Sequence, residues 1–136
     1  LPTDIDKYLP EADFVISTVP HTPETEFMFN SKRFKIMKNS AYFINVGRGM
    51  VCKLDDLVHA IESNEISGCG LDVYEIEPLP DNHKLWSLDN VMLTPHIAVA
   101  EAANLNNRRY EILENNAKLF LKNQDLINVV DKEKWF

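Results

Sequence analysis

Four short, nearly continuous apolar runs constrain this chain more than any other feature of its sequence. They cover residues 14–19, 41–46, 68–73 and 91–94. Runs of this length without polar alternation are typical of strands that are buried on both faces of a parallel sheet. They are far shorter than the stretch of about 20 apolar residues that crosses a bilayer. The runs therefore predict an α/β fold with parallel strands, one for each run, and no membrane span.

Helices are predicted between and after these runs. One helix is expected over 54–63, where apolar residues recur with helical spacing: Leu54, Leu57, Val58 and Ile61. A shorter helix is expected over 31–38, with Ser31 as its N-cap. Apolar positions also follow a helical period from 101 to 122, which indicates a long C-terminal helix. Strands that alternate with helices favour right-handed crossovers and a parallel sheet.

Composition excludes several classes of function. The chain has 14 basic and 21 acidic residues and a net charge of −7, which argues against nucleic acid or an anionic membrane surface as a partner. The cysteines, Cys52 and Cys69, have neither the spacing of a disulfide framework nor that of zinc ligands. We expect buried, unreactive thiols, no metal site and a reducing, cytoplasmic setting.

Four ionisable residues lie at the ends of the predicted strands. Arg48 comes after the second run, Asp72 lies within the third with Glu77 just beyond it, and His96 follows the fourth. The carboxyl ends of the strands line the ligand crevice in open α/β sheets. Arg48 can bind a carboxylate through two parallel hydrogen bonds, and His96 can exchange a proton when a carboxylate orients its ring. The set suits reduction of a 2-oxo acid, with hydride supplied by a nicotinamide cofactor.

The motifs around these residues resemble those of the D-isomer-specific 2-hydroxyacid dehydrogenases, in the family's order and at consistent spacing. They are Glu11-Ala12-Asp13, Thr22-Pro23-Glu24-Thr25, Ile44-Asn45-Val46-Gly47-Arg48-Gly49, Gly70-Leu71-Asp72-Val73, Glu77-Pro78-Leu79-Pro80 and Leu93-Thr94-Pro95-His96-Ile97. The segment 77–86 is most similar to the branch of glyoxylate and hydroxypyruvate reductases.

The resemblance implies a role for each matched residue. Arg48 binds the carboxylate and carbonyl of the substrate, His96 is the general acid and base, and Glu77 is its partner. The cofactor, NAD or NADP, is expected to meet residues at the strand ends: Pro20, Val46, Gly47, Asp72 and Ala98. The substrate is a small 2-oxo or 2-hydroxy acid of the glyoxylate or hydroxypyruvate type. The complete enzyme is expected to be a homodimer.

The resemblance also implies that the chain is the C-terminal part of an enzyme. Residues 1–100 correspond to the second half of a Rossmann-type, doubly wound nucleotide-binding domain, and residues 101–136 to a long helix and tail that return toward a substrate domain. The glycine fingerprint of that fold is absent, since the glycines are Gly47, Gly49, Gly68 and Gly70. We expect this chain alone to be inactive and to associate through its open first strand.

Other interpretations stay open. Arg48 can serve as a structural ion-pair partner, His96 as a turn residue, and Asp72 as a turn or capping side chain. A nicotinamide-sensing interaction protein, like the corepressors that resemble this family, can retain all the catalytic residues. Two positions depart from the family pattern: Val99 adds bulk beside the nicotinamide position, and Lys53 replaces an aspartate that commonly caps the following helix.

Overall fold

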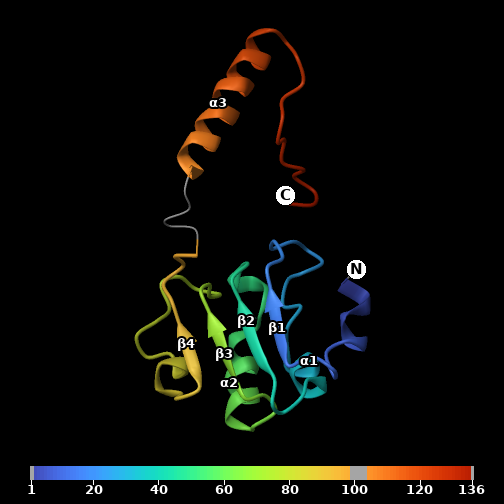
Figure 1. Ribbon diagram of the computed structural model, residues 1–136, viewed down its shortest axis with the longest axis vertical. Helices are drawn as coiled ribbons and strands as arrows, with labels where there is room; N and C mark the ends of the chain where they lie inside the picture. The colour runs from blue at the N-terminus through green and yellow to red at the C-terminus, as the bar shows by residue number, and fades with distance from the viewer. Residues whose placement is uncertain (1, 99–103, 136) are drawn as a thin grey trace. The chain divides into compact units, whose positions relative to one another are not determined.

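The computed structural model describes residues 2–98 and 104–135 of the chain. The chain divides into two compact units, Leu1–Ala98 and Val99–Phe136. The first unit holds a sheet with helices packed on it, and the second holds one long helix and the tail (Figure 1). The boundary predicted near residue 100 lies outside the described residues.

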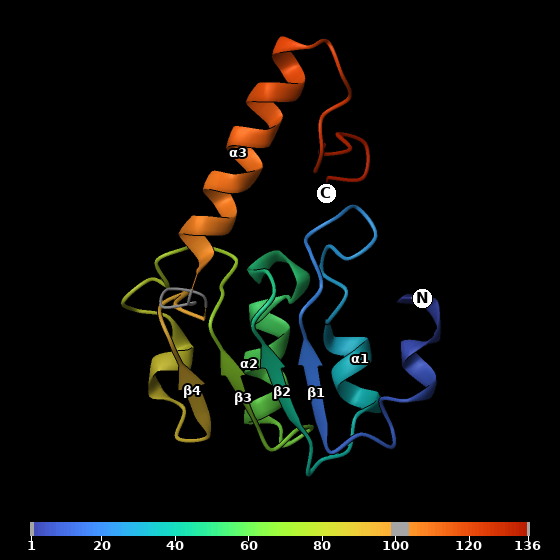
Figure 2. The same ribbon diagram turned by 45° about the horizontal axis from the view of Figure 1, so that its top comes forward.

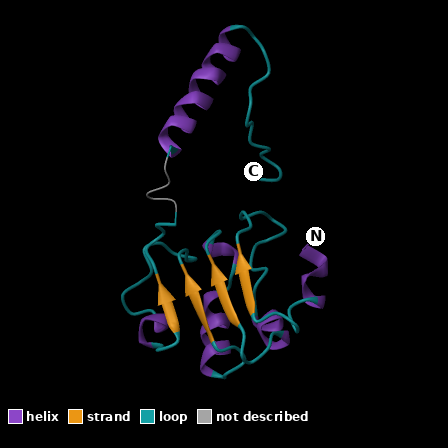
Figure 3. Ribbon diagram, viewed as in Figure 1, coloured by secondary structure: helices purple, strands orange, loops and turns teal. Residues whose placement is uncertain are grey.

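The predicted strands are present and parallel. They are β1 (Phe14–Ser17), β2 (Tyr42–Asn45), β3 (Gly68–Leu71) and β4 (Val91–Leu93), hydrogen-bonded in the order β1-β2-β3-β4. All the arrows point the same way in Figure 3. The register aligns the last residues of the strands, Ser17, Asn45, Leu71 and Leu93. The loops that follow the strands therefore leave from one edge of the sheet.

Helices cover one face of the sheet and lie behind the strands in Figure 2. α2 (Leu54–Glu62) agrees with the predicted helix, and its apolar residues are buried. α1 (Ser31–Ile36) begins where predicted and ends earlier. Short 3-10 helices form at η1 (Pro2–Lys7), η2 (Gly49–Val51) and η3 (Lys84–Ser87).

The N-cap of α1 is Asn30, so the prediction of Ser31 as the cap is wrong. The Asn30 side chain accepts a hydrogen bond from the Lys32 amide at 3.1 Å, as N-cap residues do. The amide of Ser31 donates instead to the Asp56 carboxylate of α2 at 2.9 Å. Ser31 therefore belongs to the contact between the two helices.

The core of the first unit lies between the sheet and its helices. Phe43 of β2 is fully buried, and its ring centroid lies 4.7 Å from that of Phe29 and 5.5 Å from that of Phe34 of α1. Aromatic pairs at such distances add to the stabilisation that burial itself supplies. This cluster joins the central part of the sheet to the helix layer.

The continuous apolar runs predicted strands buried on both faces of the sheet, and this prediction is wrong for the first unit. β1 and β2 alternate between buried and more exposed positions. Phe14, Ile16 and Met92 point to the uncovered face and are 64%, 60% and 71% exposed. The reason is that helices lie on only one side of the sheet within residues 2–98.

The second unit consists of α3 (Leu105–Leu121) and the tail. α3 agrees with the predicted C-terminal helix, although Ala102, one of its predicted apolar positions, lies outside the described residues. The tail is tied to α3 because the side chain of Asn116 bonds both the amide and the carbonyl of Ile127, each at 2.9 Å. None of the helices described in 2–98 and 104–135 has the length and apolar character that a membrane span requires.

We predict that Phe43→Ala lowers the free energy of unfolding of the chain by about 3–5 kcal/mol, because it leaves a cavity beside two other rings. Ile16→Ala on the exposed face of the same sheet should cost less than about 1 kcal/mol. Urea titration followed by circular dichroism measures both. Equal losses for the two variants would contradict the assignment of the core to one face.

Candidate active site

Asn45, the last residue of β2, shapes the turn that carries Arg48. Its buried side-chain amide donates to the Arg48 carbonyl at 3.0 Å, and its Oδ1 accepts from the Gly47 amide at 3.1 Å. The Arg48 guanidinium is exposed and donates to the Gly47 carbonyl at 2.8 Å. A polar residue that ends an apolar strand thus fixes where the guanidinium emerges.

His96 and Glu77 are in direct contact. Nδ1 of His96 lies 2.7 Å from Oε2 of Glu77, although the two residues are far apart in the chain. The other carboxylate oxygen of Glu77 accepts from the Tyr74 amide at 3.0 Å. The two carboxylate oxygens of Glu77 therefore have different partners. Oε1 is hydrogen-bonded to the backbone of the loop that carries Glu77, and Oε2 contacts the imidazole of His96.

The charges around Glu77 favour its ionised form. Partial burial raises the pKa of Glu77, but hydrogen bonds from His96 and the Tyr74 amide, together with the charges of His96 and Arg48, bring the pKa below its ordinary value. The guanidinium of Arg48 thus acts on the carboxylate that orients His96. The structure brings these three predicted catalytic residues to one edge of the sheet.

The buried carboxylate of Asp72 holds the loop that carries His96. It accepts hydrogen bonds from the Thr94 hydroxyl and, each at 2.9 Å, from the amides of Ile97 and Ala98. Burial raises the pKa of Asp72, yet these hydrogen bonds and the charge of His96 together lower it below the ordinary value. His96 itself has a φ of 53°, a left-handed conformation that persists in non-glycine residues where the surroundings enforce it.

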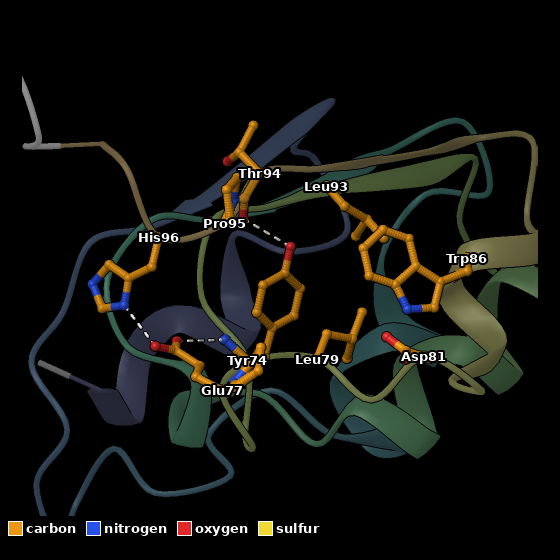
Figure 4. Close-up of a pocket in the computed structure, with 10 residues that line it drawn as sticks. Tyr74, Glu77, Leu79, Asp81, Trp86, Leu93, Thr94, Pro95 and His96 are labelled. Carbon is orange, nitrogen blue, oxygen red and sulfur yellow. Dashed lines mark hydrogen bonds and ion pairs between the residues drawn. The ribbon is translucent and has the colours of Figure 1, made fainter.

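A largely apolar pocket of about 710 Å³ adjoins the pair. Figure 4 shows His96 and Glu77 on one side of it and Leu93 and Trp86 on the other, with the ring of Tyr74 between them. The hydroxyl of Tyr74 donates to the Thr94 carbonyl at 2.9 Å. The pocket therefore places an apolar surface next to the groups that can move a proton.

The residues expected to meet the cofactor also follow the strand ends. Pro20, Val46 and Ala98 are exposed, whereas Gly47 and Asp72 are buried. Gly47 packs so closely on the loop after β1 that a Cβ there would lie 2.7 Å from the Val19 carbonyl oxygen. Val99, the departure noted beside this site, lies outside the described residues.

Cys52 and Cys69 are buried and free. Burial raises the pKa of Cys69 to about 12 and raises that of Cys52 well above its ordinary value. Both thiols are therefore protonated near neutral pH and unsuited to nucleophilic attack, in agreement with the prediction. Within the described parts of the chain, no cluster of three or more histidine, cysteine or acidic side chains could hold a metal ion.

Several contacts of the site were not predicted from the sequence. They are the hydrogen bonds of the Asn45 and Tyr74 side chains and the hydrogen bond between the carboxylate of Glu75 and the amide of Leu54. A polar residue at the end of an apolar strand was the available signal for Asn45. The contact of Glu75 with α2 has no such signal, since it joins segments that only the fold brings together.

Comparison with known proteins identifies the family. Residues 2–98 match the family model described as D-isomer specific 2-hydroxyacid dehydrogenase, NAD binding domain. A glyoxylate reductase from Thermofilum pendens is 42% identical over 131 residues, which is 96% of this chain. The chain thus belongs to the D-isomer specific 2-hydroxyacid dehydrogenase family, and the resemblance found in the sequence is confirmed.

Solved structures agree with this assignment. An NADPH-dependent glyoxylate/hydroxypyruvate reductase from Sinorhizobium meliloti, in complex with NADP and sulfate, has a TM-score of 0.85 at 30% identity and covers 98% of this chain. A D-isomer specific 2-hydroxyacid dehydrogenase from Xanthobacter autotrophicus Py2, in complex with NADPH and MES, has a TM-score of 0.84 at 33% identity and covers 95%. The chain spans 38% of the length of the Thermofilum reductase and 43% and 52% of these two structures.

We predict that Asp72→Asn lowers the free energy of unfolding at pH 7 by about 2–3 kcal/mol, because the backbone amides of the loop lose a charged acceptor. The contribution of Asp72 is complete above its ordinary pKa of about 3.9. It is lost as the pH falls through the lower pKa of the folded protein. The stability gap between the wild type and Asp72→Asn should therefore shrink with increasing acidity.

Urea titrations between about pH 2.5 and 7 measure this gap. Asp89→Asn serves as the control, because Asp89 is exposed. A gap that stays constant over the whole range would contradict the ionised, hydrogen-bonded state of Asp72.

Proposed function

We propose that this chain forms the acid–base and nicotinamide side of a reductase that converts a small 2-oxo acid to a D-2-hydroxy acid. The observation that carries the proposal is the contact of 2.7 Å between His96 and Glu77, with the charge of Arg48 acting on the same carboxylate. Membership in the dehydrogenase family supports it. Relatives named glyoxylate reductase and glyoxylate/hydroxypyruvate reductase B favour substrates of that size.

Each side chain of this site has a distinct role in the proposed reduction. Arg48 binds the substrate carboxylate through paired hydrogen bonds and polarises the neighbouring carbonyl. His96, whose Nδ1 is engaged by Glu77, presents Nε2 and donates a proton to the carbonyl oxygen. Glu77 keeps the ring in that orientation. In the reverse direction His96 accepts the proton of the hydroxyl group.

A nicotinamide nucleotide, NAD or NADP, would supply or accept the hydride. The residues present fit the nicotinamide end of such a molecule, because Pro20, Val46 and Ala98 offer exposed, small apolar surfaces at the strand ends. Asp72, which already accepts three hydrogen bonds, would meet it chiefly through the loop that it holds. A homodimer of the complete enzyme and a cytoplasmic location remain predictions.

We predict that, in the complete enzyme that contains this segment, His96→Ala lowers kcat for glyoxylate or hydroxypyruvate about 10²- to 10⁴-fold, the usual share of a general acid. Arg48→Gln should raise KM for the acid and lower kcat. NAD(P)H oxidation followed at 340 nm measures both, and fluorescence titration shows whether cofactor binding persists. His59→Ala is the matched control, because His59 is exposed on α2, away from the strand ends.

The same experiment separates an enzyme from a sensor. Loss of turnover with retained cofactor binding in His96→Ala supports the reductase. A wild-type protein that binds NAD(P)H yet turns over no 2-oxo acid would overturn it and would favour a nicotinamide-sensing interaction protein.

A further inference from the structure

The N-terminus of α2 has no cap from its own segment. Lys53 occupies the N-cap position, and its side chain makes no capping hydrogen bond. The carboxylate of Asp56, in the first turn, accepts from the amide of Ser31 in α1. The first amides of a helix need acceptors from elsewhere. Glu75, from the loop after β3, supplies one: its Oε1 accepts a hydrogen bond from the amide of Leu54, the first residue of α2.

This bond joins two loops that each carry a group of the site. Glu75 lies two positions before Glu77, and Leu54 begins the helix that follows the turn of Arg48. The same loops touch through their backbones at Gly49, where a Cβ would lie 1.8 Å from the Tyr74 carbonyl oxygen. The negative charge of Glu75 also suits the positive end of the α2 dipole. The hydrogen bond of Glu75 to the Leu54 amide thus connects the loop that carries Glu77 with the segment that follows Arg48.

We propose that Glu75 is a positioning residue: by bonding the first amide of α2, it sets the spacing between Arg48 and the pair formed by Glu77 and His96. This role rests on the proposed reduction. A substrate held by Arg48 through its carboxylate must present its carbonyl oxygen to His96, so the spacing between the two residues determines whether proton transfer is aligned. Displacements of about 1 Å in such geometry can cost 10²-fold in rate. Glu75 itself need not touch the substrate.

The test compares variants of the complete enzyme. Glu75→Ala should lower kcat about tenfold or more while the Kd of NAD(P)H stays within about twofold, since alignment is lost and the cofactor surface is not. Glu75→Gln keeps an oxygen acceptor for the Leu54 amide and should retain most of the wild-type kcat. Asp55→Asn is the matched control: Asp55 is exposed in the first turn of α2, so the change removes a negative charge near the same helix N-terminus and leaves the bond between Glu75 and the Leu54 amide in place.

A double variant separates positioning from helix capping. Lys53→Ser supplies a conventional N-cap to α2, so Glu75→Ala/Lys53→Ser should regain the Tm of the wild type while kcat stays low. Recovery of kcat together with Tm would show that Glu75 is only a cap and would overturn the positioning role. An unchanged kcat in Glu75→Ala would overturn it as well.

Hydrogen exchange distinguishes this proposal from the proposed function. If the wild type reduces no 2-oxo acid, the reductase proposal fails. The link between the loops can still be tested by the hydrogen-exchange rate of the Tyr74 amide, which donates to Glu77. In the double variant this amide should exchange faster than in the wild type. Unchanged protection of Tyr74 in that variant would overturn the link as well.

Discussion

Parallel pairing with aligned strand ends is the constraint on which the rest of this structure depends. Ser17, Asn45, Leu71 and Leu93 occupy one register line, so each strand passes into its loop at the same level of the sheet. Residues far apart in the sequence therefore leave the sheet side by side. An antiparallel partner anywhere in this order would send its following loop to the opposite edge.

The loop after β3 positions the other segments of the site through three carboxylates, each of which has a different partner. Asp72 holds the backbone of the loop after β4, Glu75 holds the first amide of α2, and Glu77 holds the imidazole of His96. Each carboxylate accepts from a donor that the fold brings within reach, which offsets the cost of clustering negative charge. One short segment thereby connects the loops of two neighbouring strands.

Local sequence was sufficient for elements whose signal is periodic and for residues that follow strands. The strands and α2 were predicted from hydrophobic period, and parallel topology placed Arg48, Glu77 and His96 at one edge of the sheet. The pairing of His96 with Glu77 was implied by the resemblance to the dehydrogenase family, and the structure has this contact. The cap at Asn30 was missed because either of two adjacent polar residues can cap a helix. In the structure Asn30 accepts from the Lys32 amide, and the amide of Ser31 donates to Asp56 of α2. The one-sided burial of the sheet was missed because an apolar run looks the same whether one or both faces are covered.

The contact at Gly49 has a consequence for how this family can vary. A Cβ at this position would lie 1.8 Å from the oxygen and 2.0 Å from the carbon of the Tyr74 carbonyl, so two main chains meet where even a methyl group has no room. Substitutions elsewhere in the two loops can be absorbed by rotamer changes, whereas at Gly49 the backbones themselves would have to separate. Homologous sequences that keep this contact must therefore keep a glycine here, whatever substrate they have diverged to accept.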